Sequence, residues 1–106
     1  MLSLFKMEKK LNAKLIIKKI EANRVMLKKY GVKRIGLFGS FIRGDQNKKS
    51  DIDFLVEFNK DTFDNYMDTK FFLERLFRKK IDLVIERNLK KELTYVKEEA
   101  VYAKRL

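Results

Sequence analysis

Two aspartates, Asp51 and Asp53, have the side-chain type and the spacing needed to bind a divalent cation. One apolar residue, Ile52, separates them, and in an extended strand both carboxylates point to one face while Ile52 points away. Carboxylates this close repel each other unless a positive charge lies between them, and Mg2+ accepts oxygen ligands of this kind. The pair therefore predicts a metal site.

A glycine–serine pair adds a candidate phosphate site upstream. Gly39 and Ser40 follow a short apolar run, and ten residues separate Ser40 from Asp51. Such a pair can turn the end of a strand into the start of a short helix, whose free backbone N–H groups bind phosphate. Arg43, just past this turn, could neutralise charge that develops on the phosphates. A phosphate site beside metal-binding acids indicates metal-assisted chemistry on a nucleoside triphosphate.

The amino-acid composition excludes several other chemistries. The 106 residues include no histidine and no cysteine, so the commonest general base, the usual zinc ligands and any thiolate nucleophile are missing. Without a disulfide framework or a secretory signal, the chain is expected to be cytoplasmic. The net charge of +11 favours anionic partners, although 39% charged residues also fits a solvated surface of lysines and glutamates. Nucleic-acid binding and self-association stay open, and no membrane partner is expected.

The elements around these residues predict an α/β (α+β) fold, a mixed β-sheet of three or more strands flanked by helices. We expect a single domain spanning residues 1–106, in which residues 1–7 form a frayed tail or a segment that contacts a partner. Periodicity and turn residues predict helices over 8–30, 62–78 and 90–103, strands over 32–38, 51–58 and 80–86, a helical turn over 40–43 and a surface loop over 45–50.

The strand over 51–58 has two different faces. Its apolar face consists of Ile52, Phe54, Val56 and Phe58, and its other face of Asp51, Asp53, Leu55 and Glu57. The sheet is therefore expected to be half buried, with its acidic face open to a cleft. The helix over 62–78 is apolar on more than one side, because Phe72 and Leu76 lie away from its main stripe. Burial between two layers or a partner would explain them, and we favour a partner.

A third acid, Asp82, lies in the middle of the apolar strand over 80–86. Burying an unpaired carboxylate is costly, so its presence there needs a reason. If this strand lies beside the strand over 51–58, Asp82 can join Asp51 and Asp53 around the same metals. A salt bridge to Lys79, Lys80 or Arg87 is the alternative explanation.

These motifs together resemble those of a known superfamily. Gly39-Ser40-Phe41-x-Arg43-Gly44 followed by Ser50-Asp51-Ile52-Asp53 resembles the signature of the DNA polymerase β-like nucleotidyltransferases. Within it, the short chain and the pattern of Gly-Ser, ten residues and Asp-x-Asp resemble the minimal nucleotidyltransferase (MNT) family. Ile42, where many relatives have alanine, is a small departure that leaves the chemistry untouched.

The resemblance implies a polymerase β-like fold that binds ATP with two Mg2+ ions. Gly39, Ser40 and the amides around them would hold the β- and γ-phosphates. Asp51 and Asp53 would ligate both metals. Asp82 would ligate the catalytic metal and orient or deprotonate the acceptor hydroxyl.

Each of these residues also has an ordinary structural interpretation. Ser40 could be an N-cap only, Asp51 could cap a turn and Asp53 could pair with a lysine. Arg43 could be a surface charge like many others in this chain. The shared face of the two acids and their spacing from Ser40 favour the functional interpretation.

MNT proteins commonly serve as antitoxins, so the resemblance implies an antitoxin-type protein adenylyltransferase. It would transfer AMP from ATP to a hydroxyl, in this family a tyrosine, of a partner HEPN-domain toxin. The small size agrees, since little chain is left over to bind another kind of acceptor. Two alternatives remain: an antitoxin that neutralises its partner by binding alone, and a nucleotidyltransferase for a small molecule or RNA that needs a separate substrate-binding subunit.

Overall fold

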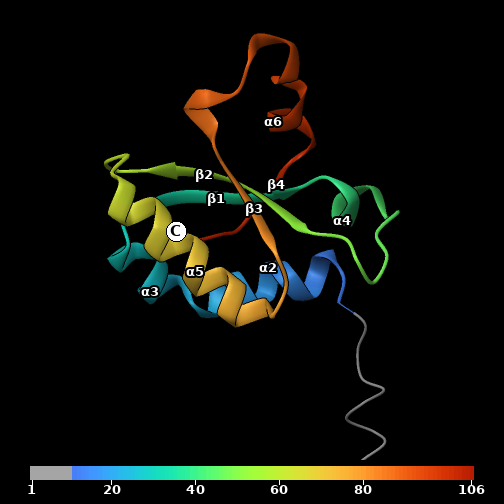
Figure 1. Ribbon diagram of the computed structural model, residues 1–106, viewed down its shortest axis with the longest axis horizontal. Coiled ribbons are helices and arrows are strands. Elements are labelled where there is room, and N and C mark those ends of the chain that lie inside the picture. The colour runs from blue at the N-terminus through green and yellow to red at the C-terminus, as the bar shows by residue number, and fades with distance from the viewer. Residues whose placement is uncertain (1–10) are drawn as a thin grey trace, which may run out of the picture.

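The computed structural model describes residues 11–106, and within them four strands form a mixed sheet (Figure 1). The strands are β1 (Val32–Phe38), β2 (Ile52–Phe58), β3 (Ile81–Ile85) and β4 (Val101–Tyr102), and their order is β3-β2-β1-β4. β1 is antiparallel to both β2 and β4, whereas β2 and β3 are parallel. The predicted mixed sheet is confirmed. The expected tail over residues 1–7 lies outside the described residues.

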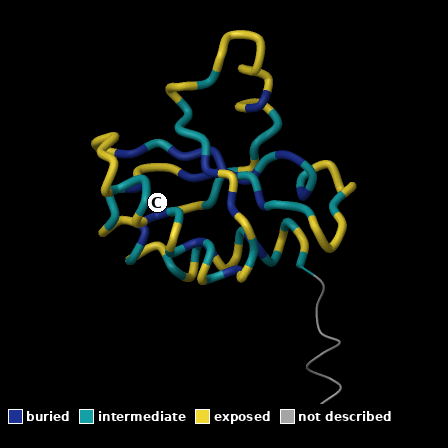
Figure 2. The backbone as a smooth tube through the Cα atoms, in the orientation of Figure 1, coloured by how far each residue is buried: buried dark blue, intermediate teal, exposed yellow. Residues whose placement is uncertain are grey.

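Three helices cover one face of this sheet: α2 (Ala13–Ala22), α3 (Arg24–Lys29) and α5 (Phe63–Phe77) (Figure 1). The predicted apolar face of β2 packs against them, because all four of its members are buried. The central core also includes Ile16, Ile20, Leu27, Ile35, Leu37, Leu73 and Phe77. In Figure 2 the strands are largely buried, while the outer sides of the helices are exposed. Burial of apolar side chains between helices and sheet therefore holds the two layers together.

The predicted helix over 8–30 is two helices within residues 11–30, and its first three positions, 8–10, lie outside the described residues. α2 begins at Ala13, where the side chain of Asn12 accepts a hydrogen bond from the amide of Leu15 (2.9 Å). The helix breaks at Asn23, whose side-chain nitrogen donates to the carbonyl of Lys19 (2.8 Å). The backbone N–H of Asn23 donates instead to the carbonyl of Ile20 (3.0 Å). An asparagine side chain that competes with the backbone in this way ends the regular helix.

The predicted helix over 90–103 is wrong for most of its length. After β3, the chain makes two 3-10 turns (Glu86–Asn88 and Lys91–Leu93), the short helix α6 (Tyr95–Glu99) and then β4. β4 pairs with the open edge of β1, and the amide of Ala103 donates to the carbonyl of Ile35 (3.0 Å). Pairing with β1 thus overrides the local helical periodicity, which tertiary context often does.

The acidic face of the sheet is covered in part. The segment from η1 (Glu86–Asn88) to α6 lies on the side of the sheet opposite α5 (Figure 1). Leu55, which we expected beside an open cleft, is fully buried, and Val96 of α6 is 7% exposed. Neither belongs to the core on the helical side. The C-terminal segment therefore shelters one part of the acidic face.

The apolar side chains off the main stripe of α5 also differ from expectation. Phe72 and Leu76 are partly buried and pack against the core. The centre of the Phe72 ring lies 5.7 Å from the centre of the Tyr30 ring. Burial between layers therefore explains them better than a partner does. The exposed aromatic residues of α5 are instead Phe63 and Phe71. No helix among the described residues is long and apolar enough to cross a membrane.

Candidate active site

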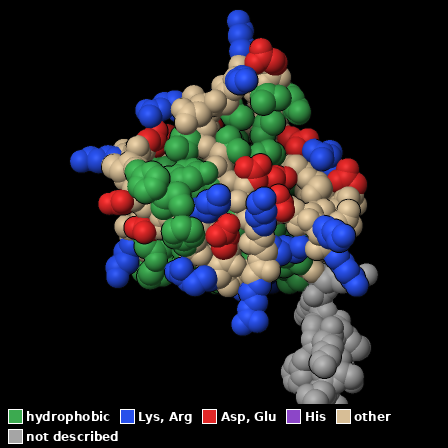
Figure 3. All heavy atoms as spheres, in the orientation of Figure 1, with side chains coloured by type: hydrophobic (Ala, Val, Ile, Leu, Met, Phe, Trp, Pro, Cys, Tyr) green, Lys and Arg blue, Asp and Glu red, His purple; other side chains and the backbone are tan. Residues whose placement is uncertain are grey.

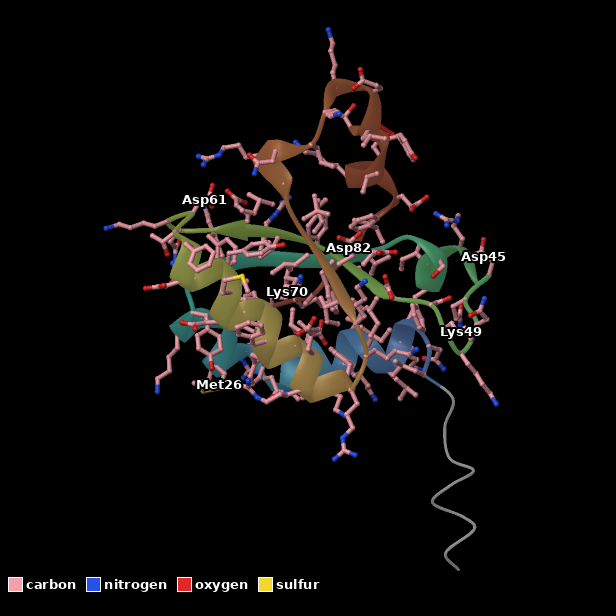
Figure 4. All side chains as sticks on the ribbon, viewed as in Figure 1. Met26, Asp45, Lys49, Asp61, Lys70 and Asp82 are labelled. Carbon is pink, nitrogen blue, oxygen red and sulfur yellow. The ribbon has the colours of Figure 1, made fainter. Side chains whose placement is uncertain are left out.

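The pairing of β2 with β3 brings two of the predicted acids together. In this parallel register Asp53 lies directly beside Asp82, so both side chains lie on the same face of the sheet. Asp53 is partly buried, whereas Asp82 is exposed near the middle of the molecule (Figure 4). We expected these two strands to be neighbours, and the prediction that Asp82 lies beside the other acids depended on it. The structure confirms that they are neighbours.

Burial and neighbouring acids disfavour the ionised form of the Asp53 carboxyl. Burial, together with the charge of Asp82, a hydrogen bond to it and the charge of Asp51, raises the pKa of Asp53 to about 6, although Arg43 opposes the shift. A carboxyl with so high a pKa gains a proton or a cation readily, because either one relieves the repulsion. In Figure 3 acidic side chains gather near the middle of the face shown, among lysines and arginines.

Asp51 contributes charge rather than direct contact. It immediately precedes β2 and acts on Asp53 through its charge. Within residues 11–106 no three acidic side chains come close enough to hold a metal ion by themselves, so the predicted set of three ligands is not assembled as a protein cage. Mg2+ is commonly bound by one or two carboxylates together with substrate phosphates and waters. Asp53 and Asp82, with Asp51 nearby, fit a site of that kind.

The alternative that these acids serve only to form structural salt bridges finds little support in the described part of the chain. Asp82, Asp51 and Asp53 take part in no ion pair there. Two of the three cations considered for Asp82 are engaged elsewhere, because Arg87 pairs with Asp61 and Lys79 donates to backbone carbonyls. Lys80, the third, makes no ion pair among the described residues. The three acids are therefore free of structural salt bridges among these residues.

Gly39 can only be a glycine. Its φ of 78° lies in the region that side chains disfavour, and a Cβ there would overlap Oδ2 of Asp53. The missing side chain thus allows the turn after β1 and the acid of β2 to come together. This contact links the phosphate motif to the acid motif across the ten residues that separate them in sequence.

Ser40 is the first residue of α4 (Ser40–Arg43), and Gly39 stands at the N-cap position. The N-cap interpretation of Ser40 is therefore wrong. Its hydroxyl makes no hydrogen bond within residues 11–106, while its carbonyl accepts from the amides of Gly44 (2.9 Å) and Asp45 (3.2 Å). The helical turn ends at Gly44 as predicted. The Ser40 hydroxyl is thus unengaged within the described part of the chain.

Lys79, one of the cations expected to pair with Asp82, instead fixes the loop over 45–50. Its Nζ donates to the carbonyls of Lys48 (3.0 Å) and Ser50 (3.1 Å). Ser50 also orders this loop, because its Oγ accepts from the amide of Asn47 (2.8 Å). Together these contacts hold the chain immediately before Asp51.

Arg43 is held between two carboxylates. Its Nε lies 3.4 Å from Oδ2 of Asp45, which is labelled in Figure 4, and its Nη1 lies 3.7 Å from Oε1 of Glu99. Glu99 also accepts a hydrogen bond from the amide of Gly39 (3.2 Å). Reasoning from the sequence missed Glu99, because nothing in the spacing of residues ties it to a turn so far away in the chain.

Comparison with known proteins agrees with this geometry. Residues 16–106 match the nucleotidyltransferase domain family. The chain belongs to this family. A protein adenylyltransferase, MntA, of Thermococcus cleftensis is 36% identical over 63 residues, which is 58% of this chain and 64% of that protein.

Solved structures place this nucleotidyltransferase among the minimal members, as the resemblance implied. A minimal nucleotidyltransferase superposes with a TM-score of 0.74 at 31% identity, covering 86% of this chain and 95% of that one. A chain of the MntA–HpeT toxin–antitoxin, solved in a mutant form, gives a TM-score of 0.58 at 27% identity, covering 92% and 75%. The predicted polymerase β-like architecture is confirmed by these likenesses.

Proposed function

We propose that this nucleotidyltransferase is an antitoxin-type protein adenylyltransferase, which transfers AMP from ATP to a tyrosine hydroxyl of a partner HEPN toxin. The observation that carries the proposal is the acid pair Asp53–Asp82, aligned on neighbouring strands beside the Gly39 turn. Chemistry on a nucleoside triphosphate needs both parts at once, a place for the phosphates and acids that hold a cation beside them.

Each residue has a defined part in this reaction. Ser40 and the backbone around Gly39 hold the β- and γ-phosphates, and Arg43 offsets their charge. Two bound Mg2+ ions would neutralise charge on the attacking and leaving oxygens. Asp51, Asp53 and Asp82 would hold these ions together with the phosphates. Because Asp82 is the exposed member, it can also reach the acceptor hydroxyl.

The transfer is an in-line displacement at the α-phosphorus. The acceptor oxygen forms a bond to this phosphorus while the bond to the bridging oxygen of pyrophosphate breaks. The hydroxyl proton passes to the carboxylate of Asp82, since the chain has no histidine to accept it. The products are the adenylylated hydroxyl and pyrophosphate.

A protein acceptor is supported by the relatives and by the surface of the chain. One relative is named a protein adenylyltransferase, and another was solved as part of a toxin–antitoxin. Large apolar side chains are available for a partner on two sides of the molecule: Phe63 and Phe71 on α5, and Leu93 and Tyr95 in the C-terminal segment.

Intact-mass spectrometry of the protein encoded next to this chain, the expected toxin, tests the proposal. The toxin is incubated with the protein, ATP and Mg2+, and mass gains in whole AMP units are expected. Asp53→Asn and Asp82→Asn should each slow the gain by about a hundredfold or more, because each removes charge from the reacting centre. Asp68→Asn, an exposed acid of α5, is the matched control and should behave as wild type.

Two other outcomes point to the alternative functions. If no mass is gained and a tight complex forms equally with Asp53→Asn, the protein neutralises its partner by binding alone. If ATP is consumed only when a small molecule or RNA is supplied, the acceptor is not the toxin. Either result overturns the proposed activity.

A further inference from the structure

The pairing of β4 with β1 decides where Glu99 lies. Leu37 faces Val101 and Gly36 faces Tyr102 in this antiparallel register. Continuing the same register by two residues beyond Leu37 and Val101 places Gly39 opposite Glu99. A residue close to the end of the described chain therefore lies directly across from the turn that follows β1.

The backbone that carries Glu99 is anchored on both sides. Before it, Val96 is buried, and the carbonyl of Val96 accepts a hydrogen bond from the amide of Ala100 (2.9 Å). After it, β4 is paired with β1, and the ring of Tyr102 lies so close over Gly36 that an added Cβ would stand 2.8 Å from it. The Glu99 side chain thus extends from a backbone with little freedom to move.

The Glu99 carboxylate joins two groups that belong to the phosphate site. Its Oε1 accepts from the amide of Gly39 at 3.2 Å and lies 3.7 Å from Nη1 of Arg43. The Glu99 side chain is 24% exposed and that of Arg43 is 53% exposed, so this ion pair is partly shielded from solvent on the side of Glu99. Nη2 of Arg43 makes no hydrogen bond within residues 11–106, and it is left to contact a phosphate.

We propose that Glu99 is a positioning residue for nucleotide binding, which holds the Gly39 turn and aims the Arg43 guanidinium at the triphosphate. This inference rests on the proposed function, because it assigns Arg43 to the phosphates. The carboxylate acts through Arg43 and the turn and does not touch the nucleotide. A long arginine side chain loses conformational freedom when it is held, and Glu99 holds Arg43 before the nucleotide arrives.

The first test replaces Glu99→Gln, which keeps an oxygen for the Gly39 amide and removes the charge that holds Arg43. Isothermal titration calorimetry with Mg2+ and a non-hydrolysable ATP analogue should show affinity weakened about fivefold, as loss of a partly shielded ion pair implies. In turnover assays the KM for ATP should rise by a similar factor, while kcat changes by less than about twofold. Glu98→Gln, the exposed neighbour, is the matched control and should change neither.

A double-mutant cycle separates positioning from a purely structural role. In an Arg43→Gln background, Glu99→Gln should not weaken binding of the analogue any further, because the guanidinium that Glu99 positions is absent. Glu99→Ala in the wild-type background also loses the Gly39 contact and should weaken binding more than Glu99→Gln. The unfolding temperature of Glu99→Gln serves as the check that the fold is intact.

The outcomes distinguish this inference from the proposed function. If Arg43→Gln weakens binding of the analogue but Glu99→Gln does not, the inference is overturned and the proposed function stands. If Glu99→Gln weakens binding equally in both backgrounds, Glu99 acts without Arg43 and the inference is again overturned. If the wild-type protein does not bind the analogue, the proposed function fails and the inference fails with it.

Discussion

Asp53 and Asp82 are neighbours in the sheet but differ in their surroundings. Asp53 is partly buried and lies among Asp82, Asp51 and the Gly39 turn, and these surroundings raise its pKa to about 6. Asp82 is exposed. The difference suits the proposed roles, because a confined carboxylate holds a cation well, while an exposed one can reach an acceptor.

The raised pKa of Asp53 predicts a pH-dependent difference in stability between wild type and Asp53→Asn. The folded protein holds the proton up to about pH 6, whereas the unfolded chain releases it near 3.8. The stability that this carboxyl contributes is therefore fully present below pH 3.8 and is lost as pH rises through 6.

Urea denaturation without metal, from pH 4 to 8, measures this effect. Asp53→Asn should be more stable than wild type above pH 6, and the difference should shrink as the pH approaches 4. Comparison with Asp68→Asn at each pH removes the general effect of losing an acid. A difference between Asp53→Asn and wild type that does not vary with pH would contradict the assigned surroundings of Asp53.

At the scale of elements, the two-residue strand β4 affects both the edge of the sheet and the candidate site. It closes the β1 edge of the sheet and brings Glu99 to the Gly39 turn. The guanidinium of Arg34 lies 4.3 Å from the ring centre of Tyr102 and pairs with Glu86 (3.2 Å). Cation–π contact and ion pairing thus connect β1, β4 and the turn after β3.

Gly36→Ala tests how tightly β4 is seated. A Cβ at Gly36 would meet the Tyr102 ring at 2.8 Å, so the ring and β4 must shift. We expect the free energy of unfolding to fall by about 1–3 kcal/mol, the usual cost of overpacking. In a Tyr102→Ala background the same change should be nearly neutral or stabilising, because alanine restricts the unfolded chain more than glycine does. Equal losses in both backgrounds, measured by chemical denaturation, would argue against this contact.

At the scale of the whole molecule, the two faces of the sheet have different tasks. Helices α2, α3 and α5 bury the apolar face, and the acids lie on the other face, which the C-terminal segment covers in part. The Gly39 turn and the acids of β2 and β3 come from separate parts of the chain. Cation and nucleotide binding should therefore stabilise the folded molecule as a unit, because the unfolded chain has no such site.

The melting temperature should accordingly depend on Mg2+. At pH 7.5, with Mg2+ at ten times its Kd, the wild type should gain about 1.4 kcal/mol, which corresponds to several degrees for a chain of this size. A chelator should reverse the shift. Asp53→Asn should show little or none of it, whereas Asp68→Asn should show it in full. Equal shifts for wild type and Asp53→Asn would indicate that Mg2+ binds elsewhere.

Much of the site follows from residues that are close together in sequence. The Gly-Ser turn, the acid pair and the apolar face of β2 depend on spacings of two to about a dozen residues, which turn chemistry and strand alternation determine locally. The same local rules predicted β1, α4, β2, α5 and β3 close to their observed bounds. For these elements the packed core agrees with the local preference.

Only the tertiary structure decided the rest, because the deciding partners are far apart in the chain. The open edge of β1 draws residues 101–102 into a strand where their local periodicity predicts a helix. That pairing places Glu99 against Gly39, a contact across 60 positions, and also against Arg43. The parallel register of β2 and β3 likewise pairs Asp53 with Asp82, and Asp51 acts on Asp53 through its charge.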